Sequence, residues 1–183
     1  MGKIRNIAVY CASLPGNTPA YCNAAAELGK LLTERGIGLV YGGSDCGTMK
    51  VLAEAVLANH GNATGIFPEG FRAELLHPGL TRSIMVKDLA ERKAKMLELA
   101  DAAIALPGGF GTFDELFDAY CLYKLGYHRK PCGLLNIAGY YNGLIRFIAH
   151  GVAEGLISRD DRNRLLTAGQ PGKLLELLEA AAV

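Results

Sequence analysis

Short runs rich in apolar residues alternate with longer amphipathic segments along this chain. Runs bounded by glycine, proline or serine predict buried strands at 4–11, 38–41, 63–67, 83–86, 102–106 and 132–136. Apolar positions three and four apart predict helices at 21–35, 48–59, 89–99, 112–125, 141–154 and 173–180. Because strands and helices alternate, we predict an α/β fold, a Rossmann-like, doubly wound parallel sheet with helices on both faces. We expect a single domain over residues 1–183.

Loops rich in glycine or serine follow three of the predicted strands. They carry Ser13, Gly43 and Gly108. Ligands of doubly wound sheets bind outside the carboxyl ends of the strands. We therefore expect these loops to form a cleft large enough for a nucleotide.

The loop after the fifth predicted strand, PGGFGTFDE at 107–115, has the composition of an anion site. Three glycines precede a helix, whose first turn has free N–H groups and a partial positive charge that suit a phosphate. Thr112 adds a hydroxyl, and Glu115 lies one turn further on, facing the same opening. A carboxylate beside a phosphate is electrostatically costly, which indicates a function. T-x-x-E is also a capping box, but a plain cap does not need three glycines.

Composition excludes several classes of function. The net charge of +1 over 183 residues gives no basis for nucleic-acid binding. No apolar run approaches the ~20 residues that span a membrane, and the first residues lead into a strand rather than a signal peptide. Five scattered cysteines without a C-x-x-C pair indicate reduced thiols in the cytoplasm. No dinucleotide fingerprint or P-loop is present, and we expect neither a metal nor a cofactor.

A basic pair lies on the helix before the central strand. Arg92 and Lys93 belong to a charge cluster, which is usually a solvated helix face. With Leu89, Met96 and Leu99 facing inward, however, Arg92 lies at the border of the buried face. Arginine binds phosphate or carboxylate bidentately, so Arg92 is a candidate for the cleft.

The segment 71–81 is irregular and mixed in charge, and we expect a mobile flap there. Its Glu74 and His77 read as surface residues from local sequence alone. His128, in LGYHRKP, also reads as loop surface.

Several motifs in one order resemble a known family. PGGFGTFDE is similar to the PGGxGTxxE signature of the "lonely guy" cytokinin riboside 5'-monophosphate phosphoribohydrolases, many of which are labelled lysine decarboxylases. CASLPG, YGGSDCGTMK, LAERKAKM, LGYHRKP and GLLNIAGYYN resemble further motifs of that family, and the resemblance covers about residues 7–157.

The resemblance implies an enzyme that hydrolyses the N-glycosidic bond of a nucleoside 5'-monophosphate, giving free base and ribose 5-phosphate. It implies that Arg92 and Glu115 are catalytic. The implied substrate-binding residues are Ser13, Gly43, Glu74, Lys93, Gly108, Gly109, Phe110, Gly111, Thr112 and Asp114. It also implies a homodimer with the active site near the interface.

Departures from the family pattern leave the preferred base open. Ser44 replaces a glycine, and Thr48-Met49-Lys50 replaces Leu-Met-Gly. Further departures are Leu89, Ala90, Cys121, Leu122 and Lys124.

Two other interpretations remain open. One is a non-catalytic nucleotide-binding or molybdenum-cofactor carrier protein of the same fold, but the presence of both Arg92 and Glu115 favours an enzyme. The other is a literal lysine decarboxylase, whose chemistry needs pyridoxal phosphate on a buried lysine. Lys87, Lys93 and Lys95 lie in charged surroundings, and the chain is short for such an enzyme.

Overall fold

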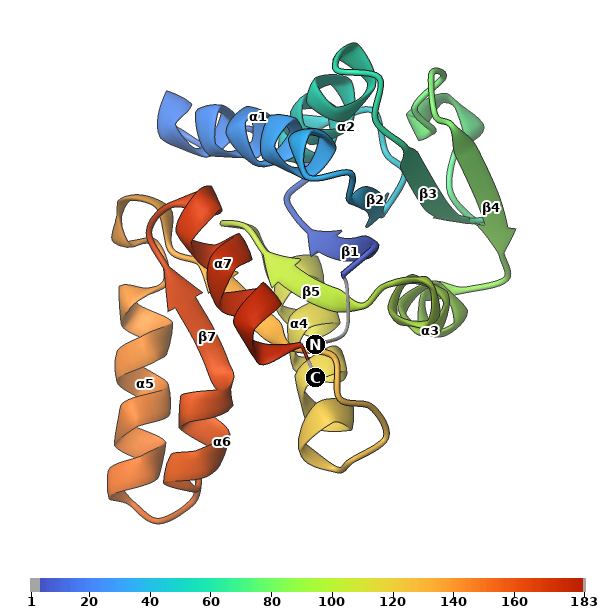
Figure 1. Cartoon of the computed structure of the whole chain (residues 1–183). Helices are drawn as coiled ribbons and strands as arrows, with labels where there is room; N and C mark the ends of the chain where they lie inside the picture. The colour runs from blue at the N-terminus through green and yellow to red at the C-terminus, as the bar shows by residue number, and fades with distance from the viewer. Residues whose placement is uncertain (1–3, 183) are drawn as a thin grey trace.

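Seven strands form one parallel sheet in the computed structural model of this chain (Figure 1). The structure describes residues 4–182, so residues 1–3 and 183 of the predicted domain lie outside it. The strands are β1 (Asn6–Tyr10), β2 (Gly38–Tyr41), β3 (Ala63–Pro68), β4 (Arg82–Val86), β5 (Ala102–Ala105), β6 (Cys132–Leu135) and β7 (Leu165–Ala168). Their order is β4-β3-β2-β1-β5-β6-β7. This confirms the predicted doubly wound parallel sheet.

Helices cover both faces of the sheet. They are α1 (Pro19–Glu34), α2 (Gly47–Ala58), α3 (Leu89–Leu99), α4 (Phe110–Lys124), α5 (Asn142–Ala153), α6 (Arg159–Arg164) and α7 (Pro171–Ala181), with 3-10 helices η1 (Ala73–Leu75) and η2 (Ile137–Gly139). Buried side chains of α1, α2 and α7 pack on one face, and those of α3, α4 and α5 on the other. Among the described residues, no helix is both long and apolar enough to cross a membrane.

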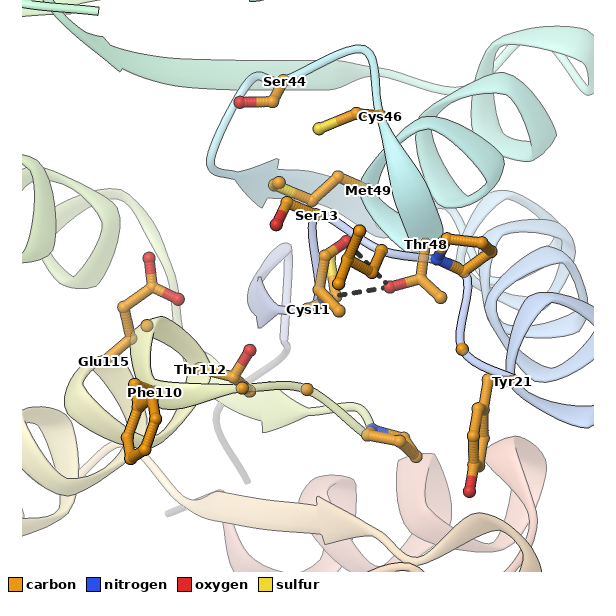
Figure 2. Close-up of a pocket in the computed structure, with 18 of the residues that line it drawn as sticks. Cys11, Ser13, Tyr21, Ser44, Cys46, Thr48, Met49, Phe110, Thr112 and Glu115 are labelled. Atoms are coloured by element: carbon orange, nitrogen blue, oxygen red, sulfur yellow. Dashed lines mark hydrogen bonds between the residues drawn. The ribbon is translucent and has the colours of Figure 1, made fainter. Parts of the chain in front are cut away.

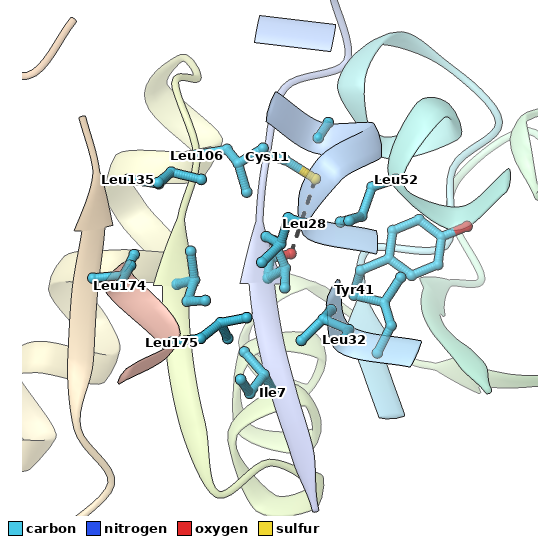
Figure 3. Packing of buried hydrophobic residues seen from close by; sticks show 14 of the residues in the cluster. Ile7, Cys11, Leu28, Leu32, Tyr41, Leu52, Leu106, Leu135, Leu174 and Leu175 are labelled. Carbon is cyan, nitrogen blue, oxygen red and sulfur yellow. Dashed lines mark hydrogen bonds between the residues drawn. The ribbon is translucent and has the colours of Figure 1, made fainter. Parts of the chain in front are cut away.

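Alternation along the central strand β1 divides the core into two layers. Ile7 and Val9 face α1, α2 and α7, where Leu28 is fully buried (Figure 3). Ala8 and Tyr10 face the other layer. Since successive strand residues point to opposite faces, a strand buried on both sides is apolar throughout.

The sheet order reverses direction between β1 and β5. Chain order runs outward through β2, β3 and β4 on one side of β1, and through β5, β6 and β7 on the other. The loops after β1 and β5 therefore lead to helices on opposite faces, and a crevice opens between them. The glycine-rich loop at 107–109 borders this crevice.

The sequence-based predictions were wrong in three places. We did not predict α6 and β7, which form a continuous unit at one edge of the sheet. Leu89, predicted to face inward, is 50% exposed. The segment 71–81 contains η1, and Leu76 forms an isolated antiparallel bridge with Ser44, so it is not wholly irregular.

Candidate active site

A cavity of about 530 Å³ lies at the crevice between β1 and β5 (Figure 2). The loops after β1, β2 and β5 line it, together with residues from α3, the segment 71–75 and Tyr140. This volume is in the range of small-molecule sites. Figure 2 shows Ser13 on the loop after β1, across the cavity from Thr112 and Glu115 on α4.

The glycine loop places the first turn of α4 against the cavity. The helix begins at Phe110 with Gly109 as its N-cap, and no side chain caps it. The capping-box interpretation is therefore wrong, because Thr112 and Glu115 lie inside the helix. The first N–H groups of α4 are free of side-chain caps and can bind an anion.

Gly108 permits a close approach that other residues would block. A Cβ built there would lie 2.1 Å from Thr112 Oγ1, and Thr112 is buried. The hydroxyl of Tyr140 donates a hydrogen bond of 2.6 Å to the Gly108 carbonyl. The loop is therefore held from both sides, which fixes the direction of its peptide groups.

Arg92 and Glu115 form a nearly buried ion pair at the cavity. Arg92 Nη1 lies 3.2 Å from Glu115 Oε1, and the side chains are only 12% and 8% exposed. Arg92 Nε also donates to the Ile66 carbonyl at 3.1 Å. Gly42 makes room for the guanidinium, because a Cβ there would lie 1.8 Å from Nη2. The helix α3 thus places Arg92 beside the Glu115 carboxylate on α4.

The carboxyl group of Glu115 titrates near neutral pH. Burial raises its pKa to about 7, although the neighbouring Arg92 guanidinium lowers it, and the Asp114 carboxylate raises it further. A pKa near the working pH suits a group that accepts and returns a proton. Exclusion of water by the surrounding side chains is therefore the main cause of the raised pKa.

Eight of the predicted site residues line the cavity. They are Ser13, Arg92, Gly108, Gly109, Phe110, Gly111, Thr112 and Glu115. The structure brings together the glycine loop, the basic helix and the serine loop, as predicted from the sequence.

Four predicted site residues do not line the cavity. Lys93 and Asp114 pair with each other at 2.8 Å. Glu74 is exposed on η1. Gly43 has φ of +80° and packs against Gly65, so it shapes the second loop, while its neighbour Ser44 lines the cavity.

Some lining residues have no signal in the sequence that assigns them to the site. Tyr140 follows η2 and reaches the glycine loop only because β6 lies beside β5. Tyr21 of α1 packs edge-on against Tyr140 with centroids 5.7 Å apart. Thr48, at the start of α2, is also in the lining. The motif GLLNIAGYYN contained Tyr140, but local sequence does not tell which tyrosine faces the cavity.

Two histidines that we predicted to be exposed on the surface are buried or half-buried in the structure. His77 is buried, and His128 is half-buried, stacked on Tyr123, with Nε2 2.9 Å from the Ala119 carbonyl. The burial of both rings depends on tertiary packing, which the irregular sequence around them does not indicate.

Asp45, Glu54 and His77 form the one group among residues 4–182 with the composition and spacing of a metal site. The Lys50 ammonium already lies 3.1 Å from Asp45. His77 Nδ1 accepts a hydrogen bond from the Gly79 N–H, so the neutral ring carries its proton on Nε2, the nitrogen that faces Asp45. The group does not fit a metal ion.

Comparisons with known proteins agree with the sequence motifs. Residues 49–178 match the family model described as "Possible lysine decarboxylase". A probable cytokinin riboside 5'-monophosphate phosphoribohydrolase of Oryza sativa subsp. japonica is 43% identical over 99% of this chain and 80% of its own length. The cytokinin riboside 5'-monophosphate phosphoribohydrolase of Rhodococcoides fascians is 42% identical over 88% of this chain and 83% of its own length.

Solved structures share the fold at low identity. The molybdenum cofactor binding protein of Rippkaea orientalis has a TM-score of 0.73 at 21% identity, with all of both chains covered. The molybdenum cofactor carrier protein of Chlamydomonas reinhardtii has a TM-score of 0.72 at 19% identity, with 98% of each chain covered. These two likenesses concern the fold alone. The matches in sequence, which extend over nearly the whole chain, go further: the protein belongs to the lonely guy family of cytokinin riboside 5'-monophosphate phosphoribohydrolases.

Proposed function

We propose that this protein hydrolyses the N-glycosidic bond of adenosine 5'-monophosphates, plain or modified on the base, to free base and ribose 5-phosphate. The observation that carries the proposal is the buried Arg92–Glu115 pair beside the uncapped first turn of α4. The names of the relatives support the same reaction.

The phosphate binds, in this proposal, at the start of α4. The peptide N–H groups from Gly108 to Thr112 and the helix dipole supply positive potential without a lysine. The Thr112 hydroxyl adds a donor, and Ser13 approaches from the opposite loop. Binding at this point would fix the ribose between the two loops.

Glu115 then acts on the sugar. The bond between C1' and the base nitrogen breaks with its electron pair leaving on the base, and positive charge develops on the ribose. An ionised Glu115 stabilises that charge and takes a proton from the water that attacks C1', while the base gains a proton from solvent. Such a positioned base contributes about 10²–10⁴-fold in rate.

Arg92 has two chemical uses in this site. Its Nη1 keeps part of the Glu115 population ionised by lowering the carboxyl pKa. Its remaining N–H groups can bind the phosphate or the leaving base, since a guanidinium carries five donors.

Apolar lining residues offer a surface for the base. Met49, Phe71 and Leu75 line the cavity together with the polar groups. A panel of nucleoside 5'-monophosphates, including N6-modified adenines, with chromatographic detection of the free base, tests the function and the base preference. Release of adenine or a modified adenine supports the proposal. If no base is released and the intact nucleotide stays bound to the protein, the result favours a carrier protein.

The literal lysine decarboxylase interpretation finds little support in the site. Among the described residues, no lysine lines the cavity. Pyridoxal phosphate chemistry needs a lysine amine at the reacting carbon. We therefore propose no decarboxylase activity.

We also propose that the protein is a cytoplasmic homodimer. Its five cysteines are all free, as in a reducing compartment. Phe110, at the cavity, is 92% exposed, which leaves an apolar ring for a second copy to cover. Light scattering of the purified protein should give twice the chain mass of 19.5 kDa, and a value of one chain mass would reject the dimer.

A further inference from the structure

The loops after β1 and β2 are joined through the side chain of Thr48. Its Oγ1 accepts a hydrogen bond from the Ala12 N–H at 3.0 Å and donates one to the Ala12 carbonyl at 3.2 Å (Figure 2). The Met49 N–H also donates to the Ala12 carbonyl, at 3.3 Å. Thr48 is 1% exposed, so water does not replace these bonds.

The backbone next to Thr48 is fitted equally closely to the loop after β1. Gly47 has φ of +54°, and a Cβ there would lie 2.3 Å from the Ser13 carbonyl carbon and 2.4 Å from the Leu14 nitrogen. The two backbones therefore touch without an intervening side chain. Ser13 has few other ways to be fixed, because the loop from Ala12 to Asn17 is outside any helix or strand.

We propose that Thr48 is a positioning residue for substrate binding, which sets the backbone of Ala12 and thereby the place of Ser13 in the cavity. This inference rests on the proposed function, because AMP is the probe. The family motif that this segment resembles has leucine at the position of Thr48. A leucine side chain could form neither bond to Ala12, because both bonds use the Thr48 hydroxyl.

If Thr48 positions the Ser13 loop, loss of its hydroxyl should change KM and kcat to different extents. Among the described residues, no hydrogen bond or ion pair joins Thr48 to Glu115 or Arg92, so we expect the reacting groups to stay in place when the Ala12 bonds are lost. A loosened Ser13 loop weakens binding of substrate and transition state alike, which raises KM more than it lowers kcat.

The experiment compares Thr48→Val, which keeps the shape but loses the hydroxyl, with Thr48→Ser, which keeps the hydroxyl. We expect KM for AMP to rise at least about tenfold in T48V and to stay within about twofold of wild type in T48S. Thermal unfolding of each variant gives the folded fraction at the assay temperature, by which the rates are corrected. If T48V does not fold, Thr48→Cys, a weak hydrogen-bonding group of similar size, takes its place with the same expectation.

A folded T48V with wild-type KM would overturn the proposal and leave Thr48 a structural residue, even if its unfolding temperature fell. Equal impairment in T48S would overturn it as well. If the wild-type protein releases no base from AMP, the proposed function fails separately. In that case calorimetric Kd values for AMP replace KM, and an unchanged Kd in T48V overturns the positioning role.

Discussion

Arg92 Nη1 and Glu115 Oε1 lie 3.2 Å apart in an almost fully buried pair, although the two residues come from different helices on the same face of the sheet. Burial of a carboxylate costs free energy, which its arginine partner offsets only in part, because the Glu115 pKa is still raised to about 7. Destabilised carboxylates of this kind cluster at functional sites, which makes Glu115 a candidate for the chemistry.

Replacement of Glu115 by glutamine should abolish AMP hydrolysis and leave AMP binding nearly intact. The amide keeps the shape of the side chain but can neither carry the negative charge nor accept the proton of water. We expect kcat to fall at least about 10³-fold, near the range of a positioned general base. The matched control is Asp118→Asn, one turn further along α4, where the carboxylate pairs with Lys93 outside the cavity. Near-normal turnover in E115Q would remove Glu115 from the mechanism.

Loss of Arg92 should both slow the reaction and move its pH dependence. The guanidinium lowers the Glu115 pKa, so Arg92→Ala should shift the acidic limb of kcat/KM to higher pH. We expect kcat/KM at pH 8 to fall about 10²-fold through the lost hydrogen bonds. Lys95→Ala, on the same helix but paired with Glu98, serves as the control. An unchanged limb in R92A would show that the pair is not coupled in solution.

The pH dependence of the wild-type reaction should follow Glu115. Only the ionised carboxylate accepts a proton, so kcat/KM should fall about tenfold per pH unit below about pH 7, where the carboxyl becomes protonated. The substrate phosphate titrates near pH 6 and would give a limb about one unit lower. A profile that is flat from pH 5 to pH 8 would contradict this assignment.

The free energy of unfolding should fall as the pH rises through the range in which kcat/KM rises. The Glu115 pKa is raised from its ordinary value of 4.5 to about 7 in the folded protein, so the folded state holds the proton more tightly than the unfolded chain does. Its contribution to stability is therefore complete below pH 4.5 and is lost as the pH rises to about 7. Relative to E115Q, the wild type should lose up to about 3 kcal/mol over this interval. Urea unfolding of both proteins at several pH values measures the difference, and parallel stability curves would contradict it.

Glycine at position 108 should be essential for the anion site. A Cβ there would lie 2.1 Å from Thr112 Oγ1, so Gly108→Ala must displace the first turn of α4. We expect the Kd for AMP to rise more than about tenfold. Gly143→Ala on α5 is the control, because its Cβ would meet no atom within 4 Å and alanine favours the helix by up to about 1 kcal/mol. Equal AMP affinity in G108A would show that the phosphate binds elsewhere.

Hydrophobic patterning was sufficient for most of the fold. The strand at 38–41 and the helix at 89–99 have the predicted bounds, since a short apolar run and a regular helical stripe leave little ambiguity. The unit of α6 and β7 was missed for a physical reason. The α6 sequence RDDRNR has no apolar stripe, and β7 follows it without a turn signal. Residues 165–168 form a strand because they pair with β6, and the local sequence does not reveal that pairing.

The glycine loop of the candidate site was predictable because its residues act through the backbone. Glycines before a helix mark an anion site, so Gly108 to Thr112 could be assigned from the sequence. The ion-pair partners that side chains find on other helices could not be predicted from the sequence. Lys93 and Arg92 are neighbours on α3, yet Arg92 turns to Glu115 while Lys93 turns to Asp114. Helix packing decides this choice, and the one-dimensional pattern does not contain it.

The central claim is that the Glu115 carboxylate lies at the glycosidic bond of a mononucleotide whose phosphate occupies the first turn of α4. A crystal structure of the E115Q variant soaked with AMP tests it most directly. The account predicts phosphate oxygens within hydrogen-bond distance of the N–H groups between Gly108 and Thr112, with C1' of the ribose facing the side chain at position 115. A phosphate bound away from this turn, or a ribose turned away from that side chain, would contradict it.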